Sequence, residues 1–219
     1  MKFLKNNNFK RFILLSFLLF IYILVSASGY VSAISNNLSE AVFRLHVIAN
    51  SDCTEDQELK LKVRDSLLEY MNTICANCTT KSEAISIALL HQNIFQEIAE
   101  NTIKENGYNY SVKVDISNCY FPTKNYGDIS LPAGMYDALR VEIGEAKGQN
   151  WWCVMFPSLC FVDISSGYVD KNSKENLQEN LETESYSLIS DNKKPNIKFK
   201  FKLIEFFAEK GLFTANKNI

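Results

Sequence analysis

The 219-residue sequence has few of the side chains on which most enzymes depend. It contains only two histidines, His46 and His91. It has no HExxH zinc-binding motif, no GxSxG nucleophile motif and no glycine-rich phosphate-binding loop. The two histidines are also too far apart in the sequence to form a recognisable pair of metal ligands. The sequence therefore argues against hydrolase catalysis of a known type, and we expect no metal site and no cofactor.

Acidic residues are absent from the first 33 positions, which carry four basic residues: Lys2, Lys5, Lys10 and Arg11. The whole chain has 23 basic and 25 acidic residues, for a net charge of -2, so residues 34–219 carry -2 - 4 = -6. This balance lacks the excess of positive charge that nucleic-acid binding requires. The apolar fraction of 47% is that of an ordinary globular protein and excludes collagen-like, fully disordered and polytopic membrane classes.

An apolar run follows the basic residues. Phe12 to Val25 contains fourteen residues interrupted only by Ser16, and small residues come after it. This order is typical of a secretory signal peptide, and we prefer cleavage after Ala33. The alternative is an uncleaved anchor, because weakly apolar residues continue to Ile34 and extend the run to about the 20 residues that span a bilayer. In both cases we expect the remainder of the chain to be exported.

Residues 34–169 show the patterns of one α+β domain. Period-two and helical spacings alternate along it, with a capping box at Thr80–Glu83 and a stop signal at Gly107. The expected strands are 41–48, 110–117, 136–144, 151–156 and a short one at 161–164; the expected helices are 55–75 and 81–105; a loop is expected at 122–134. The order predicts a mainly antiparallel sheet with two helices packed on one face.

The C-terminal fifth of the chain differs in composition. Residues 170–196 are rich in Asn, Ser, Glu and Lys, which predicts a disordered polar linker. Residues 197–219 form an aromatic and basic segment, in which Lys198 to Phe207 alternates as a strand does. That stretch is interpreted as a final strand closing an open sheet edge, or as a strand that docks on a partner.

Six cysteines can form disulfides once the chain is exported. Cys153 and Cys160 flank a segment containing Pro157, and a turn at that proline would bring the two thiols together. We predict a disulfide between them, which stabilises the fold by about 2.5 kcal/mol by the loop-entropy estimate.

Cys75 and Cys78 form a CxxC pair at the end of a predicted helix. The helix dipole disfavours a thiolate there, so a short structural disulfide or two free thiols is favoured over a redox centre. An exported thiol-disulfide oxidoreductase that uses this pair remains the alternative function. Cys53 and Cys119 have no assigned role.

Arginine is rare outside the N-terminal segment. Arg44, Arg64 and Arg140 each lie inside a predicted strand or helix. Arginine is preferred over lysine where a charge is held bidentately or partly buried. The three residues are interpreted as a structural ion-pair network with Asp65, Asp137 and Glu142, or as a surface that binds carboxylates of a protein partner.

Both tryptophans of the chain are adjacent, at Trp151 and Trp152. In a strand they point to opposite faces, so one belongs to the core while the other is exposed or covered by a loop. Exposed aromatic residues beside a rigid loop are typical of binding hot spots. The candidate partner-binding residues are therefore Arg44, Arg140, Trp151, Trp152 and Phe156.

Two long segments resemble the stage II sporulation protein R family of endospore-forming Firmicutes. They are RLHVIANSDCTEDQELKLKVRD, from Arg44 to Asp65, and FPTKNYGDISLPAGMYDALRVEIGEAKGQNWWCVMFPSLCFVD, from Phe121 to Asp163. Together with the N-terminal signal segment, the resemblance covers about two thirds of the chain. Cys53 and the pair at 75 and 78 depart from the family pattern, and Ser158 stands where a second proline is common.

The resemblance implies a signal and not an enzyme. Members are made in the forespore, exported into the space between the two membranes, and needed to activate a membrane-embedded aspartic protease of the mother cell. That protease then removes the pro-sequence of sigma-E. The expected partner is this protease, with no small-molecule substrate, and the N-terminal segment contacts the membrane before any cleavage. A wall-associated hydrolase is a third possibility, for which the sequence offers no acid–base pair.

Overall fold

The computed structural model describes residues 7–160 and 171–190. The chain divides into two compact units, residues 1–37 and residues 38–219, and each is considered by itself. Helix α1 (Asn7–Ala41) forms the first unit and contributes its last turn to the second.

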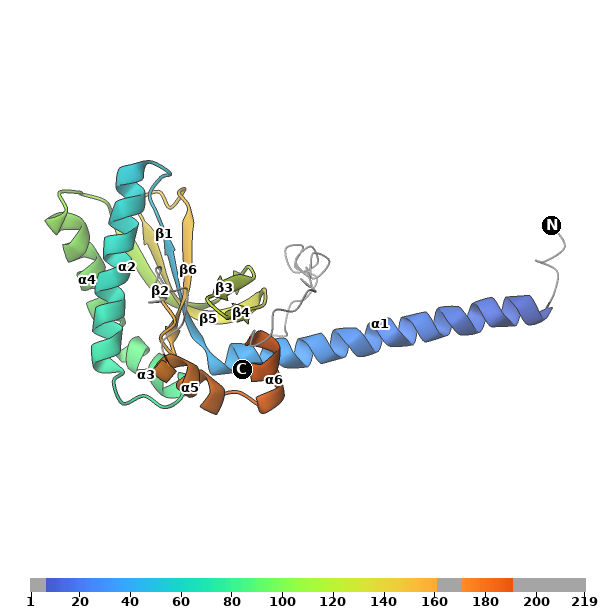
Figure 1. Cartoon of the computed structure of the whole chain (residues 1–219). Coiled ribbons are helices and arrows are strands. Elements are labelled where there is room, and N and C mark those ends of the chain that lie inside the picture. Colours follow the sequence, from blue (N-terminus) through green and yellow to red (C-terminus); the bar gives the residue numbers. More distant parts are fainter. Residues whose placement is uncertain (1–6, 161–170, 191–219) are drawn as a thin grey trace. The chain divides into compact units, whose positions relative to one another are not determined.

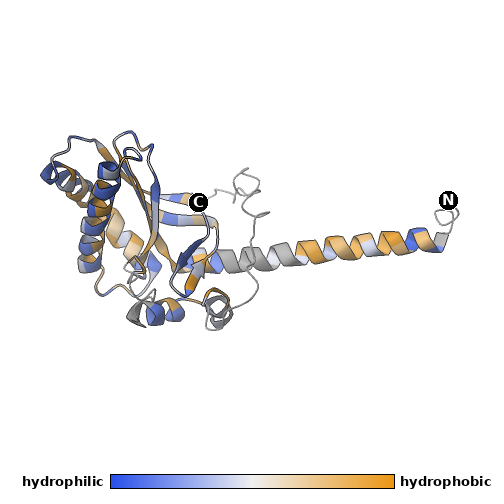
Figure 2. Cartoon of the chain, turned by 45° about the horizontal axis from the view of Figure 1, so that its top comes forward, coloured by the Kyte–Doolittle hydropathy of each residue, from blue (hydrophilic) through white to orange (hydrophobic). Residues whose placement is uncertain are grey.

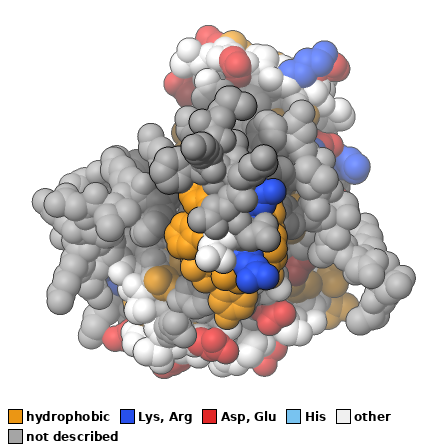
Figure 3. Space-filling model, turned by 90° about the vertical axis from the view of Figure 1, so that its right-hand side faces the viewer, with side chains coloured by type: hydrophobic (Ala, Val, Ile, Leu, Met, Phe, Trp, Pro, Cys, Tyr) orange, Lys and Arg blue, Asp and Glu red, His pale blue; other side chains and the backbone are white. Residues whose placement is uncertain are grey.

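The first unit is strongly apolar. Every apolar side chain from Phe12 to Val25 is exposed, around the whole circumference of α1 (Figure 2). Figure 3 looks along α1 from its N-terminal end, so the apolar side chains of this helix are seen end-on together with Lys and Arg side chains. The stretch Asn8–Ser26 is long and apolar enough to cross a membrane. A helix that is apolar all round is stable in an apolar medium rather than in water, which fits a signal peptide or an anchor.

The second unit is built on a four-stranded sheet. Its strands are β1 (Phe43–Ile48), β2 (Val112–Phe121), β5 (Gly134–Ile143) and β6 (Asn150–Phe156), in the order β2-β5-β1-β6. Strand β1 runs parallel to β5 and antiparallel to β6, and β2 runs antiparallel to β5. The sheet is therefore mainly antiparallel, as predicted, and the β1–β5 pair is its parallel exception.

Three helices connect β1 to β2: α2 (Thr54–Ile74), α3 (Lys81–Leu90) and α4 (Gln92–Glu105). Figure 1 shows α2 and α4 side by side on one face of the sheet. The predicted capping box is present, since the Thr80 side chain accepts from the Glu83 N–H. The single helix predicted over 81–105 is divided at His91, where the backbone leaves helical geometry. The division lets α3 contact β1 while α4 contacts β2.

Helix α4 also covers the outer edge of β2. The Gln96 side chain donates to the Val112 carbonyl at 2.6 Å and accepts from the Val114 N–H at 2.9 Å. The Gln92 side chain donates to the Val114 carbonyl at 3.2 Å. The side-chain amides of α4 thus form hydrogen bonds with backbone N–H and carbonyl groups that would otherwise be unpaired at the edge strand.

A small hairpin lies within the predicted loop 122–134. It consists of β3 (Lys124–Tyr126) and β4 (Ile129–Leu131), which pair antiparallel. Strands of three residues are too short to show a period-two pattern, so the sequence analysis missed them. Figure 1 shows the hairpin on the side of the sheet away from α2.

The sequence predicts a disordered linker at 170–196, and this prediction is wrong for residues 171–190. These residues form α5 (Lys171–Glu179) and α6 (Thr183–Ile189). Three of their few apolar residues are buried and are spaced by four and eight positions, namely Leu177, Leu181 and Ile189. Average composition conceals such a stripe, although it suffices to seat two short helices. The predicted strand at 161–164, residues 191–196 and the segment 197–219 lie outside the described residues.

The turn between β5 and β6 packs closely on the loop that follows β1. The Gly148 N–H donates to the Ala49 carbonyl at 2.9 Å, and the Lys147 N–H donates to the Asn50 carbonyl at 3.2 Å. A Cβ atom at position 148 would lie 2.2 Å from the Ser51 carbonyl oxygen. Only glycine fits this approach of two backbones.

We expect Gly148→Ala to lower the free energy of unfolding by at least about 2 kcal/mol, because the Ser51 backbone must move to make room for the new Cβ atom. Gly107→Ala is the control: its Cβ would meet no atom within 4 Å, and only its positive φ of 83° opposes the change, at about 1 kcal/mol. Urea unfolding of the two variants measures both losses. Equal losses in the two variants would contradict this account.

Candidate functional site

The candidate site lies on the face of the sheet opposite α2, which is called the open face. Paired residues on neighbouring strands share a face, and the register therefore defines rows of side chains across all four strands. Three rows belong to the open face: Lys113–Glu142–Ile48–Asn150, Asp115–Arg140–His46–Trp152 and Ser117–Ala138–Arg44–Val154. Two candidate arginines, one tryptophan and one histidine thus come together, although His46 and Trp152 are 152 - 46 = 106 positions apart in the sequence.

Arg44 is fully buried and is held by aromatic rings. Its guanidinium carbon lies 4.0 Å from the centre of the Phe121 ring and 4.7 Å from that of Tyr136. Its Nη2 donates to the Tyr126 hydroxyl at 2.6 Å, and that hydroxyl donates to the Trp152 carbonyl at 3.1 Å. No ion pair to Arg44 occurs among the described residues, and its Nη1 has no hydrogen-bond acceptor there. Cation–π contacts replace a carboxylate around this charge.

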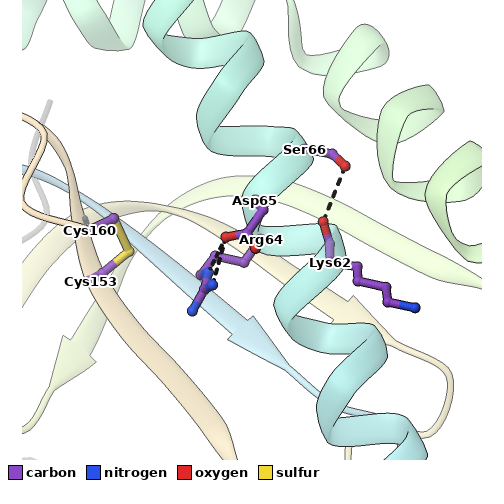
Figure 4. Close-up of polar contacts among 6 residues, drawn as sticks. All are labelled: Lys62, Arg64, Asp65, Ser66, Cys153 and Cys160. Atoms are coloured by element: carbon purple, nitrogen blue, oxygen red, sulfur yellow. Dashed lines mark hydrogen bonds and ion pairs between the residues drawn. A yellow bond between two sulfur atoms is a disulfide. The ribbon is translucent and has the colours of Figure 1, made fainter. Parts of the chain in front are cut away.

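The predicted arginine network resolves into separate pairs. Arg64 pairs with Asp65 at 2.6 Å on α2 (Figure 4), and Arg140 pairs with Glu142 at 2.6 Å on β5. The third predicted carboxylate, Asp137, pairs with Lys81 at 2.6 Å. The network prediction is therefore wrong for Arg44. In Arg140 the Nε atom is buried and lacks an acceptor within the described parts of the chain.

His46 forms the centre of the second row. Its ring stacks on Trp152 with 3.8 Å between ring centres, and its Nε2 lies 2.7 Å from Asn150 Oδ1. Burial lowers the pKa of His46 to about 4, against the opposing effect of the Asn150 hydrogen bond. The imidazole is therefore neutral at pH 7, and the stack is an uncharged aromatic pair.

The adjacent tryptophans point to opposite faces. Trp152 belongs to the open face, whereas Trp151 lies on the helix face with the Arg64 guanidinium carbon 4.3 Å from its ring centre. Both are half-buried, so neither is a fully enclosed core residue. Phe156 is buried, with 7% of its surface exposed. Of the five predicted partner-binding residues, only Arg140 and Trp152 share a row of the open face.

Two disulfides stabilise the domain. Cys153 of β6 is bonded to Cys160, the pair predicted from the sequence (Figure 4). Cys75 is bonded to Cys78, directly after α2 ends at Ile74. The carbonyl end of a helix disfavours the thiolate that thiol–disulfide exchange requires. Cys53 and Cys119 are free thiols, and burial raises the pKa of Cys119.

A second polar cluster, missed by sequence reasoning, fixes the loop between β1 and α2. The buried carboxylate of Asp56 accepts from Asn50 at 2.7 Å and from Ser51 at 2.6 Å. Burial alone would raise the pKa of Asp56, but these hydrogen bonds hold it below its ordinary value. The sequence signal for this cluster was the pair Asn50 and Ser51 just before α2, because such side chains are typical of the start of a helix. No group of His, Cys, Asp and Glu in the described residues is arranged to hold a metal ion.

We expect Tyr126→Phe to destabilise the domain by about 1 to 3 kcal/mol, because it leaves the buried Arg44 Nη2 without its acceptor. The loss should shrink when Arg44 is already replaced by Met, since no donor is then left unpaired. Urea unfolding of the two single variants and the double variant measures this coupling. Additive losses would show that the hydroxyl stabilises the fold independently of the arginine.

Stability should also depend on His46 between pH 6.5 and pH 4. The folded state disfavours the protonated ring, so its contribution is complete above pH 6.5 and is lost as the pH falls toward 4. His46→Gln should therefore lose less stability than the wild type over this interval, as followed by urea midpoints. A wild-type slope in His46→Gln would refute the expectation.

Comparison with known proteins identifies the family. The family model described as stage II sporulation protein R matches residues 39–166. The chain is 36% identical over 147 residues to Stage II sporulation protein R of Bacillus subtilis (strain 168), an alignment that covers 67% of this chain. The chain spans 66% of the length of that relative. No solved structure matches the chain. The matched region contains the whole four-stranded sheet and the open face, and the chain belongs to the stage II sporulation protein R family.

Proposed function

We propose that the protein is an exported signal of endospore formation, which leaves the forespore and activates a membrane-embedded aspartic protease of the mother cell. The protease then removes the pro-sequence of the sigma-E precursor. Membership of the stage II sporulation protein R family carries this proposal. The apolar helix α1 supports export, because it supplies a signal peptide or an anchor.

The side chains suited to catalysis have structural partners, which favours a ligand over an enzyme. His46 is stacked and hydrogen-bonded, and His91 Nδ1 lies 2.6 Å from the Tyr70 hydroxyl. Four of the six cysteines are in disulfides. A rigid domain of this kind acts by binding the active arrangement of the protease more tightly than the inactive one and so shifts the equilibrium between them.

Co-expression in a non-sporulating host tests the proposal. The full chain, the protease and the sigma-E precursor are produced together, and shortening of the precursor is followed by immunoblot. We expect shortening only when all three are present, and its loss when residues 1–33 are deleted, because export then fails. Equal processing with and without the chain would disprove the proposed function.

The alternative, an exported thiol-disulfide oxidoreductase, is tested in the same cells. If the Cys75–Cys78 disulfide is structural, replacing both residues by Ser should leave processing intact at equal secreted protein. Loss of processing in this variant, with secretion and folding unchanged, would favour the oxidoreductase.

A further inference from the structure

The four-stranded sheet has two outermost strands, β2 and β6, and their edges are protected unequally. On β6 the Trp152 carbonyl accepts from the Tyr126 hydroxyl at 3.1 Å, and the Val154 carbonyl accepts from the Leu159 N–H at 3.1 Å. On β2 the glutamines of α4 supply equivalent partners, but only as far as Val114. The part of the β2 edge that follows Val114 is therefore the more open of the two.

The backbones of Ile116 and Asn118 form this open edge. Residues of an antiparallel strand alternately direct both backbone groups toward and away from the neighbouring strand. Val112 and Val114 direct theirs away from β5, toward α4, and the pairing of β2 with β5 continues without interruption to Phe121. Ile116 and Asn118 therefore also direct theirs away from β5, and no described residue forms hydrogen bonds with them. Such an edge is a template for a further strand.

The side chains beside this edge differ between the two faces of the sheet. On the helix face, Ile116 is half-buried and Met135 of β5 is 44% exposed. On the open face, the same part of β2 carries Asp115, Ser117 and Cys119. A strand that fits here needs apolar side chains on one side and polar or basic side chains on the other, which is the alternation of a half-buried strand.

The C-terminal part of the chain contains a segment with this alternation. Between positions 198 and 203, three lysines alternate with two phenylalanines and one leucine. In an extended strand the lysines lie on one side and the apolar residues on the other. The apolar side matches Ile116 and Met135 on the helix face, and the basic side matches the face that carries Asp115.

The described chain ends close to the same edge. Ser190 forms a bridge with Ile129 of the β3–β4 hairpin, and this hairpin begins two residues after β2 ends. Residues 191–197 can span up to roughly 23 Å when extended, so the segment 198–203 can reach β2. A segment that starts from the C-terminal end of β2 and follows its edge runs antiparallel to it.

We propose that residues 198–203 add to the sheet as a fifth strand, antiparallel to β2 along Ile116 and Asn118. The apolar side chains of the segment cover Ile116 and Met135 on the helix face, and its lysines lie on the side of Asp115. The segment itself lies outside the described residues. The proposal therefore rests on the open edge, the alternation of the segment and the position of Ser190, and it does not depend on the proposed function.

Cys119 is a native reporter of the added strand. It is one of two free thiols in the chain, and Cys53→Ser leaves it as the only one. In that background, Lys198→Cys, Lys200→Cys and Lys202→Cys each place a second thiol on the side of Cys119. At least one of the three should form a disulfide with Cys119 when the purified full chain is oxidised with diamide, because facing residues of adjacent strands lie within disulfide range. Peptide mapping without reduction detects the link.

Phe199→Cys and Phe201→Cys are the matched controls, since they place the thiol on the helix face. They should give at least about fivefold less linked peptide than the best lysine position. Equal linkage from both sides of the segment, or no linkage from any lysine position, would overturn the proposal. A link between two chains, seen as a dimer on a non-reducing gel, would assign the edge to a second copy of the chain and would overturn it as well.

Amide hydrogen exchange measures the proposed hydrogen bonds directly. In the antiparallel arrangement Phe201 directs its N–H toward β2, and Phe201→Pro removes this donor. The amides of Ile116 and Asn118 should then exchange at least about tenfold faster than in the wild-type chain. Asn192→Pro, outside the segment, is the control and should leave both rates unchanged. The Val114 amide, which donates to α4 at 2.9 Å, should keep its rate in all three proteins and shows that the fold is retained.

Equal exchange rates at Ile116 and Asn118 in the wild-type chain and in Phe201→Pro would contradict the added strand. Neither measurement uses the protease or sporulating cells. Failure of the added strand and failure of the proposed function are therefore distinguishable.

Discussion

The buried guanidinium of Arg44 imposes the main constraint on the folded domain. All six residues of β1 are buried, yet the strand carries an arginine and a histidine on one side. A charge in that position needs compensation, and here Phe121, Tyr136 and Tyr126 supply ring faces and a hydroxyl. These three residues come from β2, β5 and the β3–β4 hairpin, so one side chain of the central strand organises the elements on the open side.

The two segments that resemble the family are joined by hydrogen bonds from backbone N–H groups to side chains. In the first segment, Asn50 Oδ1 accepts from the Glu145 N–H at 3.0 Å and Asp52 Oδ1 accepts from the Gln149 N–H at 2.7 Å. Both donors belong to the β5–β6 turn in the second segment. Much of the shared sequence therefore serves the junction between two parts of the fold, and similarity alone does not mark a contact surface.

The sequence allowed the longer elements to be predicted because each carries its own local signal. The capping box at Thr80 and the period-two pattern from Val112 are examples. The hairpin and helices α5 and α6 were missed, since three-residue strands and a stripe as sparse as Leu177 and Leu181 leave little local trace. The open face could not be predicted either. Its rows depend on the parallel register of Arg44 with Ala138, a pairing between residues 94 positions apart that no local pattern specifies.

The glutamine contacts of α4 have a consequence for self-association of the chain. An unpaired strand edge invites other chains to add to a sheet, and the risk grows where molecules are confined in a small volume. At Val112 and Val114 the side chains of Gln92 and Gln96 already fill the hydrogen-bonding positions of β2. This stretch of the edge is therefore closed to strand addition by another copy of the chain.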